Sequence, residues 1–361
     1  YVHLPFCEVI CHYCDFYTAR AKDARHEEFF EALNLEAQQN LPKLSQPLDA
    51  LYFGGGTPSV SPPHLLHAFI DLFRPHLTPD TEITMEANPA NINPENVKAW
   101  KAAGINRISL GVQSLDNPTL KRLGRVHSAE SALESIRLIA SEIKNVSADL
   151  IYGVPEQDKE IPAIHAKALA EAGATHVSAY HLTIPASHFL HRRLPDDAYA
   201  WDQIELVAEA LAQRGFRHYE VSNFGLPGKE SRNNGNYWRG GPYLALGPSA
   251  HGFDGDRTRW KNVADWEAYV RRLKNGGSPL DETEILTDDQ RKIEVVFTSL
   301  RTLEGLDLTA FRARFREDLQ SRHAAFFAKL EEEKLASLSN EKLVLSFRGR
   351  MLADEIAAKL L

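Results

Sequence analysis

The sequence predicts an α/β protein in which parallel strands alternate with helices, followed by a smaller helical domain. Strand-like and helix-like segments alternate from residue 1 to about residue 225. Three helix-to-strand junctions carry a glycine where helices commonly end in a left-handed residue, at Gly104, Gly173 and Gly215. With 361 residues the chain is long enough for two hydrophobic cores. This alternation favours right-handed crossovers, either in an open doubly wound sheet or in a full or partial (β/α) barrel.

The strands of the first domain are short runs rich in β-branched and aromatic residues. In chain order they are expected at residues 1–6, 51–53, 82–86, 107–113, 146–152, 176–181 and 218–222. Amphipathic helical patterns lie between them, around residues 26–40, 62–74, 94–103, 128–142 and 160–172. Ser128 is the expected N-cap of the fourth of these helices. We therefore assign residues 1–225 to one domain that carries the cysteine loop, residues 7–14.

The pattern changes after residue 225. Glycine and proline cluster between residues 225 and 252, which predicts a connecting region of loops over 226–282. From residue 283 the composition turns charged and helical, with helices expected over 288–303, 308–316, 319–333 and 351–361 and a strand over 342–346. This order fits a small, mainly helical, winged-helix-like domain over 283–361. It also fits a plain helical bundle packed on the first domain.

Composition and charge narrow the functional classes. The formal charge of −8 provides no overall basic surface for a nucleic-acid backbone, so nucleic acid is not an expected partner. No apolar run approaches the roughly 20 residues of a membrane helix, so no integral membrane segment is expected. The chain opens on a strand rather than on a signal peptide, and three clustered cysteines do not suit a disulfide framework. The expected compartment is the cytoplasm.

All three cysteines, Cys7, Cys11 and Cys14, lie within the first fourteen residues in a C-x3-C-x2-C pattern. Three thiolates can hold an iron–sulfur cluster and leave one iron without a protein ligand, where another molecule can bind. The alternative is a zinc site completed by His3 or His12, although structural zinc usually takes two separated pairs of ligands. A zinc-stabilised binding protein therefore stays open as a different class of function.

Polar residues follow several predicted strands, at the end where β/α barrels carry their active sites. Three glycines and a threonine, residues 54–57, follow the second strand, and glycine lets the backbone approach a ligand closely. The third and fourth strands end at Glu86 and Gln113, and the fifth carries Asp149. Arg125 precedes a helix and can reach back toward a ligand carboxylate. Singly, such residues are more often turn or cap residues. Together they indicate one site at the rim.

These residues resemble a known family. The cysteine loop, with an aromatic residue at Tyr13, and the later run Gly54-Gly-Gly-Thr-Pro58 are similar to the radical S-adenosylmethionine superfamily. The segments 85–89, 108–114, 149–153 and 251–252 resemble, more narrowly, its oxygen-independent coproporphyrinogen III oxidase-like branch, and within it the HemW-type haem chaperone group. The resemblance covers nearly the whole chain, including Arg348-Gly-Arg350. It implies that the first domain is a partial (β/α)6 TIM-like barrel.

The resemblance also implies the cofactors. The three cysteines would hold a [4Fe-4S] cluster, and S-adenosylmethionine would chelate its fourth iron and be cleaved to a radical, with the electron supplied by a donor such as flavodoxin or ferredoxin. In that reading the glycines and threonine face the methionine portion, the arginine faces its carboxylate, the acids and glutamine hold the nucleoside, and two tyrosines pack beside it. The positions are Tyr1, Tyr13, Gly55, Gly56, Thr57, Glu86, Gln113, Arg125 and Asp149.

Two departures from the patterns of this branch bear on the expected function. In the pattern of coproporphyrinogen oxidases, C-x3-C-x2-C-x-C, a fourth cysteine stands two places after the third. In this chain Asp15-Phe16 follow the third cysteine, so the fourth is absent. Haem binding and delivery to apo-haemoproteins is therefore favoured over oxidative decarboxylation or radical methylation of a tetrapyrrole or another substrate. The pattern of the chaperone group is His-Asn-x-x-Tyr-Trp. Residues 233–238 correspond to it, but they begin with Asn233 instead of histidine, and asparagine is a poorer iron ligand than imidazole.

Other residues must then bind haem. Among the histidines, His251 and His181 are the first candidates for an iron ligand, against the more common role of a hydrogen-bonded structural histidine. An alternative is that haem binds through its propionates to arginine and through its faces to Tyr237 and Trp238, without strong axial ligation.

Overall fold

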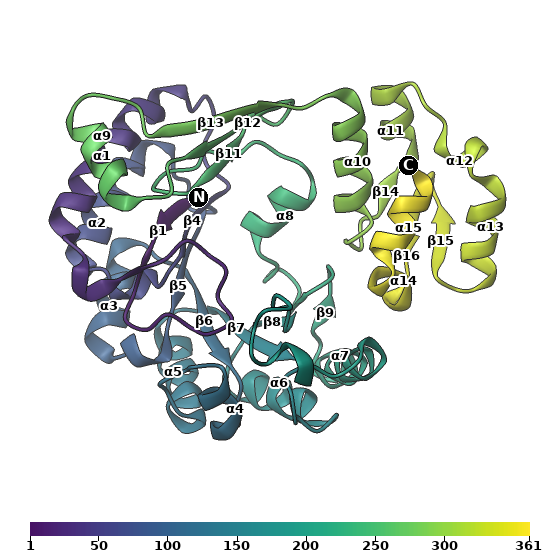
Figure 1. Ribbon diagram of the computed structural model, residues 1–361, viewed down its shortest axis with the longest axis horizontal. Coiled ribbons are helices and arrows are strands. Elements are labelled where there is room, and N and C mark those ends of the chain that lie inside the picture. Colours follow the sequence, from purple (N-terminus) through teal and green to yellow (C-terminus); the bar gives the residue numbers. More distant parts are fainter.

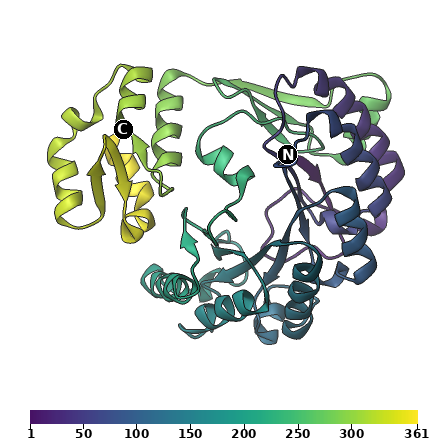
Figure 2. The same ribbon diagram turned by 180° about the vertical axis from the view of Figure 1, so that it is seen from behind.

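A computed structural model describes all 361 residues of the chain. A curved sheet wrapped by helices forms the larger part of the molecule, and a small domain that carries the C-terminus lies beside it (Figures 1 and 2). No helix combines the length and the apolar composition needed to cross a bilayer.

The central sheet has the strand order β1-β4-β5-β6-β7-β8-β10-β9. The first six run parallel, namely β1 (Val2–Leu4), β4 (Ala50–Gly55), β5 (Glu82–Ala87), β6 (Arg107–Gln113), β7 (Asn145–Tyr152) and β8 (His176–His181). The outermost strands β1 and β9 (Arg217–His218) are not hydrogen-bonded to each other, so the barrel stays open. The predicted partial (β/α)6 barrel is therefore confirmed.

The helices cover the outer face of this sheet (Figure 2). They are α1 (His26–Asn40), α2 (Pro63–Leu72), α3 (Pro94–Ala103), α4 (Asn117–Arg122), α5 (Ala129–Glu142), α6 (Ile161–Ala172) and α7 (Asp197–Ala212). Gly104 and Gly173 end α3 and α6 with φ of 104° and 115°, and the Ser128 hydroxyl caps α5 by accepting from the Ser131 amide. Sheet and helices bury a single large apolar core.

The segment 218–222 does not form the parallel strand that its sequence predicts. Strand β9 ends at His218, and β10 (Asn223–Gly225) returns antiparallel to β8. The Tyr219 amide donates to the Asn223 carbonyl at 3.2 Å, and the Tyr219 hydroxyl bonds His176 Nε2 at 2.8 Å. These contacts form a tight turn because the tyrosine side chain is anchored inside the barrel rather than along an extended strand.

Residues 226–282 are also more regular than their glycine and proline content predicts. They contain α8 (Arg232–Trp238), α9 (Trp266–Lys274) and an antiparallel sheet of β11 (His251–Phe253), β12 (Thr258–Asn262) and β13 (Leu280–Ile285). Between α8 and β11, Leu246 lies parallel to Val2 and accepts a hydrogen bond from the His3 amide at 2.8 Å. This part of the chain therefore covers the free edge of β1 instead of forming a loose connection.

The C-terminal domain has its own apolar core. It contains α10 (Asp288–Ser299), β14 (Leu306–Asp307), α11 (Leu308–Phe315), α12 (Leu319–Arg322), α13 (Ala324–Glu332), β15 (Ala336–Ser339), β16 (Lys342–Leu345), α14 (Phe347–Met351) and α15 (Ala353–Leu360). The three strands form one antiparallel sheet in which β15 and β16 are a hairpin. The winged-helix-like prediction is confirmed, and a plain helical bundle is excluded.

Candidate cofactor site at the barrel rim

The cysteine loop begins directly after β1, where β2 (Phe6–Cys7) pairs with β3 (Ala19–Arg20). The Cys7 thiol is buried and accepts a hydrogen bond from Thr57 Oγ1 at 3.3 Å, whereas Cys11 and Cys14 are partly exposed. Burial raises the pKa of the Cys7 thiol to about 11. A thiolate at this position therefore requires a positively charged partner, which a metal centre supplies.

Arg125 ties this loop to the barrel. Its Nη1 lies 3.3 Å from Cys11 Sγ, and its Nη2 donates to the Gly111 carbonyl at 2.6 Å. Its Nε is buried and has no hydrogen-bond partner. Because buried donors are normally paired, this nitrogen fits the predicted contact with a ligand carboxylate. The phenol of Tyr13 lies in the same region, beside Arg125 and Cys11, and burial raises its pKa above its usual value.

The glycine run at the end of β4 is packed tightly as well as placed at the rim. A Cβ at Gly55 would lie 2.5 Å from the His3 ring, and one at Gly56 would lie 2.5 Å from the Pro5 backbone. The amides of Gly55, Gly56 and Thr57 donate within the protein, to Glu86, Leu4 and Phe6 respectively. Backbone contacts to the methionine portion would therefore have to come from carbonyl oxygens.

Two partly buried carboxyl groups, Glu86 and Asp149, face the interior of the barrel. Glu86 accepts from Tyr52 at 2.8 Å and from the Gly55 amide at 3.2 Å, and Asp149 accepts from Ser109 at 3.2 Å. Burial raises the pKa of Glu86 to about 7 and that of Asp149 to about 6. Both groups thus change charge close to neutral pH and can accept hydrogen bonds from the hydroxyl groups of a nucleoside.

Gln113 has a strained backbone. Its φ is 70°, and the pairing of β6 with β7 shifts in register between Leu110 and Gln113. A bulge at a strand end re-aims the following side chain, and a non-glycine residue in this region of φ stores about 1–3 kcal/mol. Gln113 therefore sits in the kind of geometry that is common at ligand sites.

Tyr1 lies beside Tyr52, the residue that donates to Glu86. Its ring stacks on Tyr52 with centroids 6.1 Å apart, and its hydroxyl bonds His3 Nδ1 at 3.0 Å. His3 Nε2 lies 3.0 Å from the Tyr17 carbonyl, so both ring nitrogens of His3 already have partners. To complete a zinc site with the cysteines, His3 would therefore have to give up one of these hydrogen bonds.

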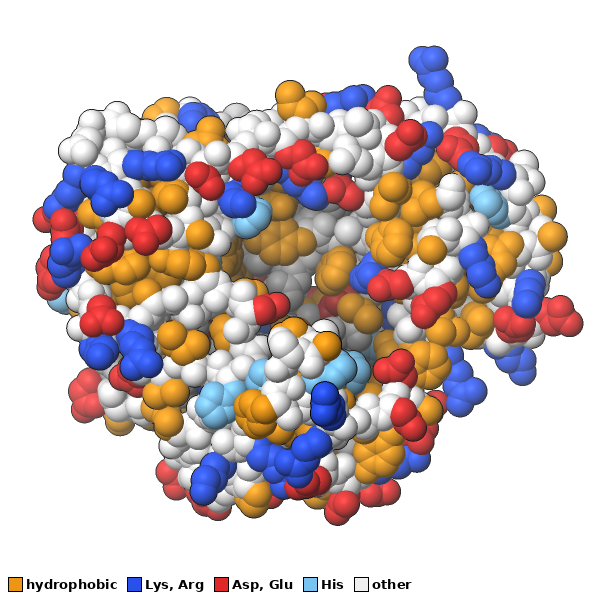
Figure 3. Space-filling model, viewed as in Figure 1, with side chains coloured by type: hydrophobic (Ala, Val, Ile, Leu, Met, Phe, Trp, Pro, Cys, Tyr) orange, Lys and Arg blue, Asp and Glu red, His pale blue; other side chains and the backbone are white.

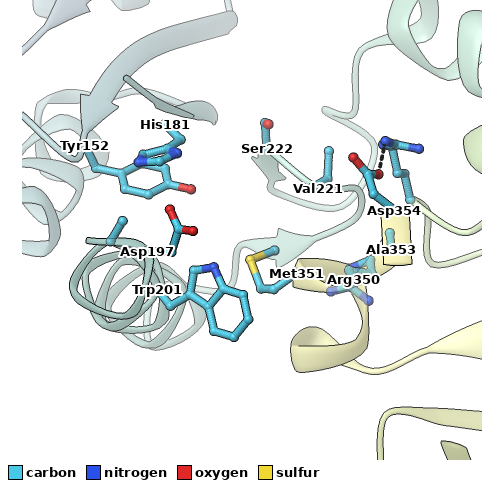
Figure 4. A pocket seen from close by; sticks show the side chains of 12 residues that line it. Tyr152, His181, Asp197, Trp201, Val221, Ser222, Arg350, Met351, Ala353 and Asp354 are labelled. Atoms are coloured by element: carbon cyan, nitrogen blue, oxygen red, sulfur yellow. Dashed lines mark hydrogen bonds and ion pairs between the residues drawn. The ribbon is translucent and has the colours of Figure 1, made fainter. Parts of the chain in front are cut away.

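The structure brings the predicted rim residues together but separates the predicted haem residues. His181 stacks on Tyr152 with centroids 5.3 Å apart, outside the barrel. Both line a cavity of about 250 Å³ between α7 and the C-terminal domain, which we call the junction cavity. In Figure 4, Asp197 and Trp201 lie on the His181 side of this cavity, and Met351 faces them from the opposite domain.

Tyr237 and Trp238 line a different cavity, of about 220 Å³, which we call the α8 cavity. Its walls come from α8, the β11–β12 hairpin and α10 and include Tyr243, Phe253 and three arginines. His251 is exposed on β11, two residues before Phe253. Since side chains two apart on a strand share a face, His251 points to the same side of the hairpin as Phe253.

Both domains of the chain match described protein families. Residues 1–166 match the Radical SAM superfamily, and residues 286–352 match the HemN C-terminal domain. The chain is 37% identical to the haem chaperone HemW of Mycobacterium tuberculosis, across 100% of this chain and 94% of that protein. It is 31% identical to HemW of Bacillus subtilis, across 99% and 97% of the two chains.

This chain belongs to the HemW family. A mitochondrial radical S-adenosyl methionine domain-containing protein of Bos taurus is 33% identical over 100% of this chain and 86% of its own length. The solved structure of the coproporphyrinogen III oxidase HemN of Escherichia coli superposes with a TM-score of 0.84, covering 99% of this chain and 88% of that one. At 22% sequence identity, that likeness confirms the fold alone.

Within this HemW family chain, the sequence did not reveal Tyr52 and Ser109, which hold the two partly buried acids. Their spacing could have revealed them, because residues two apart on a strand point to the same face of the sheet. Tyr52 precedes Gly54 by two residues, and Ser109 precedes Gly111 by two. The arginines of the α8 cavity were missed as well, and they follow no motif.

Proposed function

We propose that this chain is a radical S-adenosylmethionine protein that binds haem and delivers it to apo-haemoproteins. The observation that carries the proposal is identity of 31–37% across essentially the whole chain to proteins named as haem chaperones. An aromatic cavity that holds Tyr237 and Trp238 supports it, because these residues stand where the chaperone group has its tyrosine and tryptophan.

In this proposal Cys7, Cys11 and Cys14 hold a [4Fe-4S] cluster at the rim. When bound, the cluster supplies single electrons to S-adenosylmethionine. The chain's own residues orient that cofactor: Arg125 offers its unpartnered Nε to the carboxylate, and Glu86 and Asp149 accept from the nucleoside. A one-electron donor such as flavodoxin or ferredoxin belongs to the same proposal, as does a cytoplasmic setting in which the three cysteines form no disulfide.

His251 is the preferred iron ligand in this proposal, and His181 is the alternative. His251 shares its strand face with Phe253 of the α8 cavity, whereas His181 opens to the junction cavity. Partial burial and the neighbouring Lys261 lower the pKa of His251, so the imidazole is neutral at pH 7 and its nitrogen is free to ligate iron.

An anaerobic titration tests the proposal. The chain is reconstituted with iron and sulfide, S-adenosylmethionine is added, and haem is then titrated while the Soret band is followed. We expect a saturable Soret shift that His251→Ala diminishes and that His64→Ala, on the exposed outer helix α2, leaves unchanged. A wild-type chain that produces no spectral change with haem would contradict the chaperone function.

A further inference from the structure

The α8 cavity contains an unusual set of polar groups. Three N–H donors in its wall are buried and have no hydrogen-bond partner: Trp238 Nε1, Arg259 Nε and Arg291 Nε. Arg291 is only 3% exposed, so water does not replace the missing partner from outside. Leaving a buried donor unpaired costs about 1–3 kcal/mol. Three such donors around one cavity indicate that a ligand with acceptor atoms completes them.

The charge of the cavity has a definite sign. Its wall includes Arg239, Arg259 and Arg291 but only one acid, Glu294. Glu294 lies between two of the arginines, with Oε1 2.6 Å from Arg259 and Oε2 2.6 Å from Arg291. Arg239 pairs with a second acid, Glu304, at 3.7 Å. The two arginines that share Glu294 keep a formal charge of 2 − 1 = +1, which favours a carboxylate ligand.

Arg259 and Arg291 are already held in place. Their guanidinium carbons lie over the Phe253 ring, at 5.3 Å for Arg259 and 4.7 Å for Arg291. Glu294 fixes the outer nitrogens, so the free Nε donors keep one direction. Such preorganisation lowers the entropy that a ligand must lose on binding.

We propose that the α8 cavity is a carboxylate site that receives the propionate edge of haem, with Arg259, Arg291 and Trp238 as its hydrogen-bond donors. This assignment rests on the proposed haem function and names the groups that recognise the ligand. A volume of about 220 Å³ is below the roughly 300–1,000 Å³ of pockets that enclose a drug-sized molecule. The cavity therefore takes an edge of the macrocycle rather than all of it.

The rest of the ligand has space outside this cavity. Figure 3 shows a hollow near the centre of this face, walled in part by hydrophobic side chains. Within the cavity wall, Tyr237 packs edge-on against Tyr243, with ring centroids 4.7 Å apart. A porphyrin anchored by its propionates would thus lie against aromatic rings on the side of the barrel opening.

Haem and haem dimethyl ester test the proposal, because the ester keeps the iron and the ring but loses both carboxylate charges. For haem, we expect Arg291→Gln to raise Kd about tenfold or more, and Trp238→Phe, which keeps an aromatic ring but removes the N–H, to raise it less. For the ester, both substitutions should leave Kd within about twofold of wild type, since no carboxylate is left to lose.

Arg257→Gln is the matched control. This arginine bridges the same hairpin to α10 through Asp288 but does not line the cavity, so its loss should not change haem affinity. Arg259→Gln is the second variant, because Arg259 is partly exposed and its replacement disturbs the fold less than that of buried Arg291. The urea midpoint of each variant shows whether it folds.

The outcomes separate the two proposals. Unchanged haem affinity in Arg291→Gln and Arg259→Gln, or equal weakening of haem and its ester, overturns the carboxylate site and leaves the haem function standing. Failure of the wild-type chain to bind haem overturns the haem function. In that case glutarate, a small dicarboxylate, is the probe. If glutarate raises the melting temperature of the wild type but not of Arg259→Gln, the carboxylate site stands. If glutarate does not change the melting temperature of the wild type, the carboxylate site is overturned.

Discussion

The barrel rim and the α8 cavity are both polar sites, but they differ in how their polar groups are paired. At the rim, Glu86 and Asp149 already accept hydrogen bonds from the protein. In the α8 cavity, two arginines and a tryptophan keep buried donors without partners. Paired groups hold their geometry whether or not a ligand is present, whereas unpaired donors are satisfied only on binding. Apart from Arg125 Nε, these rim groups are paired before a ligand binds, whereas the α8 cavity leaves three donors for a ligand to complete.

The largest expected effect comes from the cysteine loop and shows whether the two sites are independent. Cys7→Ala should abolish cluster assembly, because two remaining thiolates cannot hold the cubane that three would hold. Haem affinity should stay within about twofold of wild type, since Cys7 contacts Thr57 and nothing in the α8 cavity. Iron and sulfide per chain, followed by haem titration, measure both. A full iron content in the variant would refute the assigned ligand set.

A buried carboxyl group supports both regions and provides the second prediction. Glu36 is 2% exposed and accepts from Tyr269 at 2.5 Å, Asn262 at 2.6 Å and the Gly247 amide at 2.8 Å. Asn262 ends β12. Leu246, the residue before Gly247, accepts a hydrogen bond from the His3 amide of β1. Glu36 therefore connects the hairpin of the α8 cavity with the strand that leads into the rim.

Burial raises the pKa of Glu36 from 4.5 to about 7. Between these values the folded chain binds more protons than the unfolded chain, so stability falls as pH rises, and the loss is complete above pH 7. Glu36→Gln removes this linkage. As pH rises from 5 to 7.5, the free energy of unfolding of the wild type should fall by about 2 kcal/mol more than that of the variant. Urea unfolding at both values measures it, and equal pH dependence in the two proteins would contradict it.

A smaller effect is expected at the rim acid itself. Glu86→Gln should weaken S-adenosylmethionine binding about tenfold, because an amide replaces one of the two acceptor oxygens that the carboxylate offers. Cluster content and haem affinity should not change. Glu95→Gln, on the exposed N-terminal turn of α3, is the control. Calorimetric titration of the reconstituted chain gives the affinity, and a parallel loss of iron would show that Glu86 supports the fold instead.

The smallest effect is expected in the Arg348-Gly-Arg350 motif. Arg348 is exposed and lies 3.5 Å from Glu205, so Arg348→Ala should change stability by less than about 0.5 kcal/mol. Arg350 is 4% exposed, donates to the Leu345 carbonyl at 3.0 Å and bonds His218 Nδ1 at 2.9 Å. Urea midpoints of the two alanine variants should therefore differ clearly. Equal midpoints would mean that burial does not separate the two arginines.

The rim could be found from the sequence because its residues follow local rules. The cysteines are spaced within one loop, the glycines are consecutive, Glu86 lies at the end of β5, and Asp149 lies within β7. The sequence does not predict the conformation of segments 218–222 and 226–282, because an anchored Tyr219 and a shared edge with β1 decide it. Both causes are contacts between residues far apart in the chain.

By itself the sequence determined the alternation of strands and helices, the spacing of the three cysteines and the polar residues along the strands, since periodicity and spacing act over a few residues. The tertiary structure alone decided that Arg259 of β12, Arg291 of α10 and Trp238 of α8 face one cavity. It also decided that their donors there lack partners. Whether a buried donor is paired depends on which distant elements pack around it, and no local pattern records that packing.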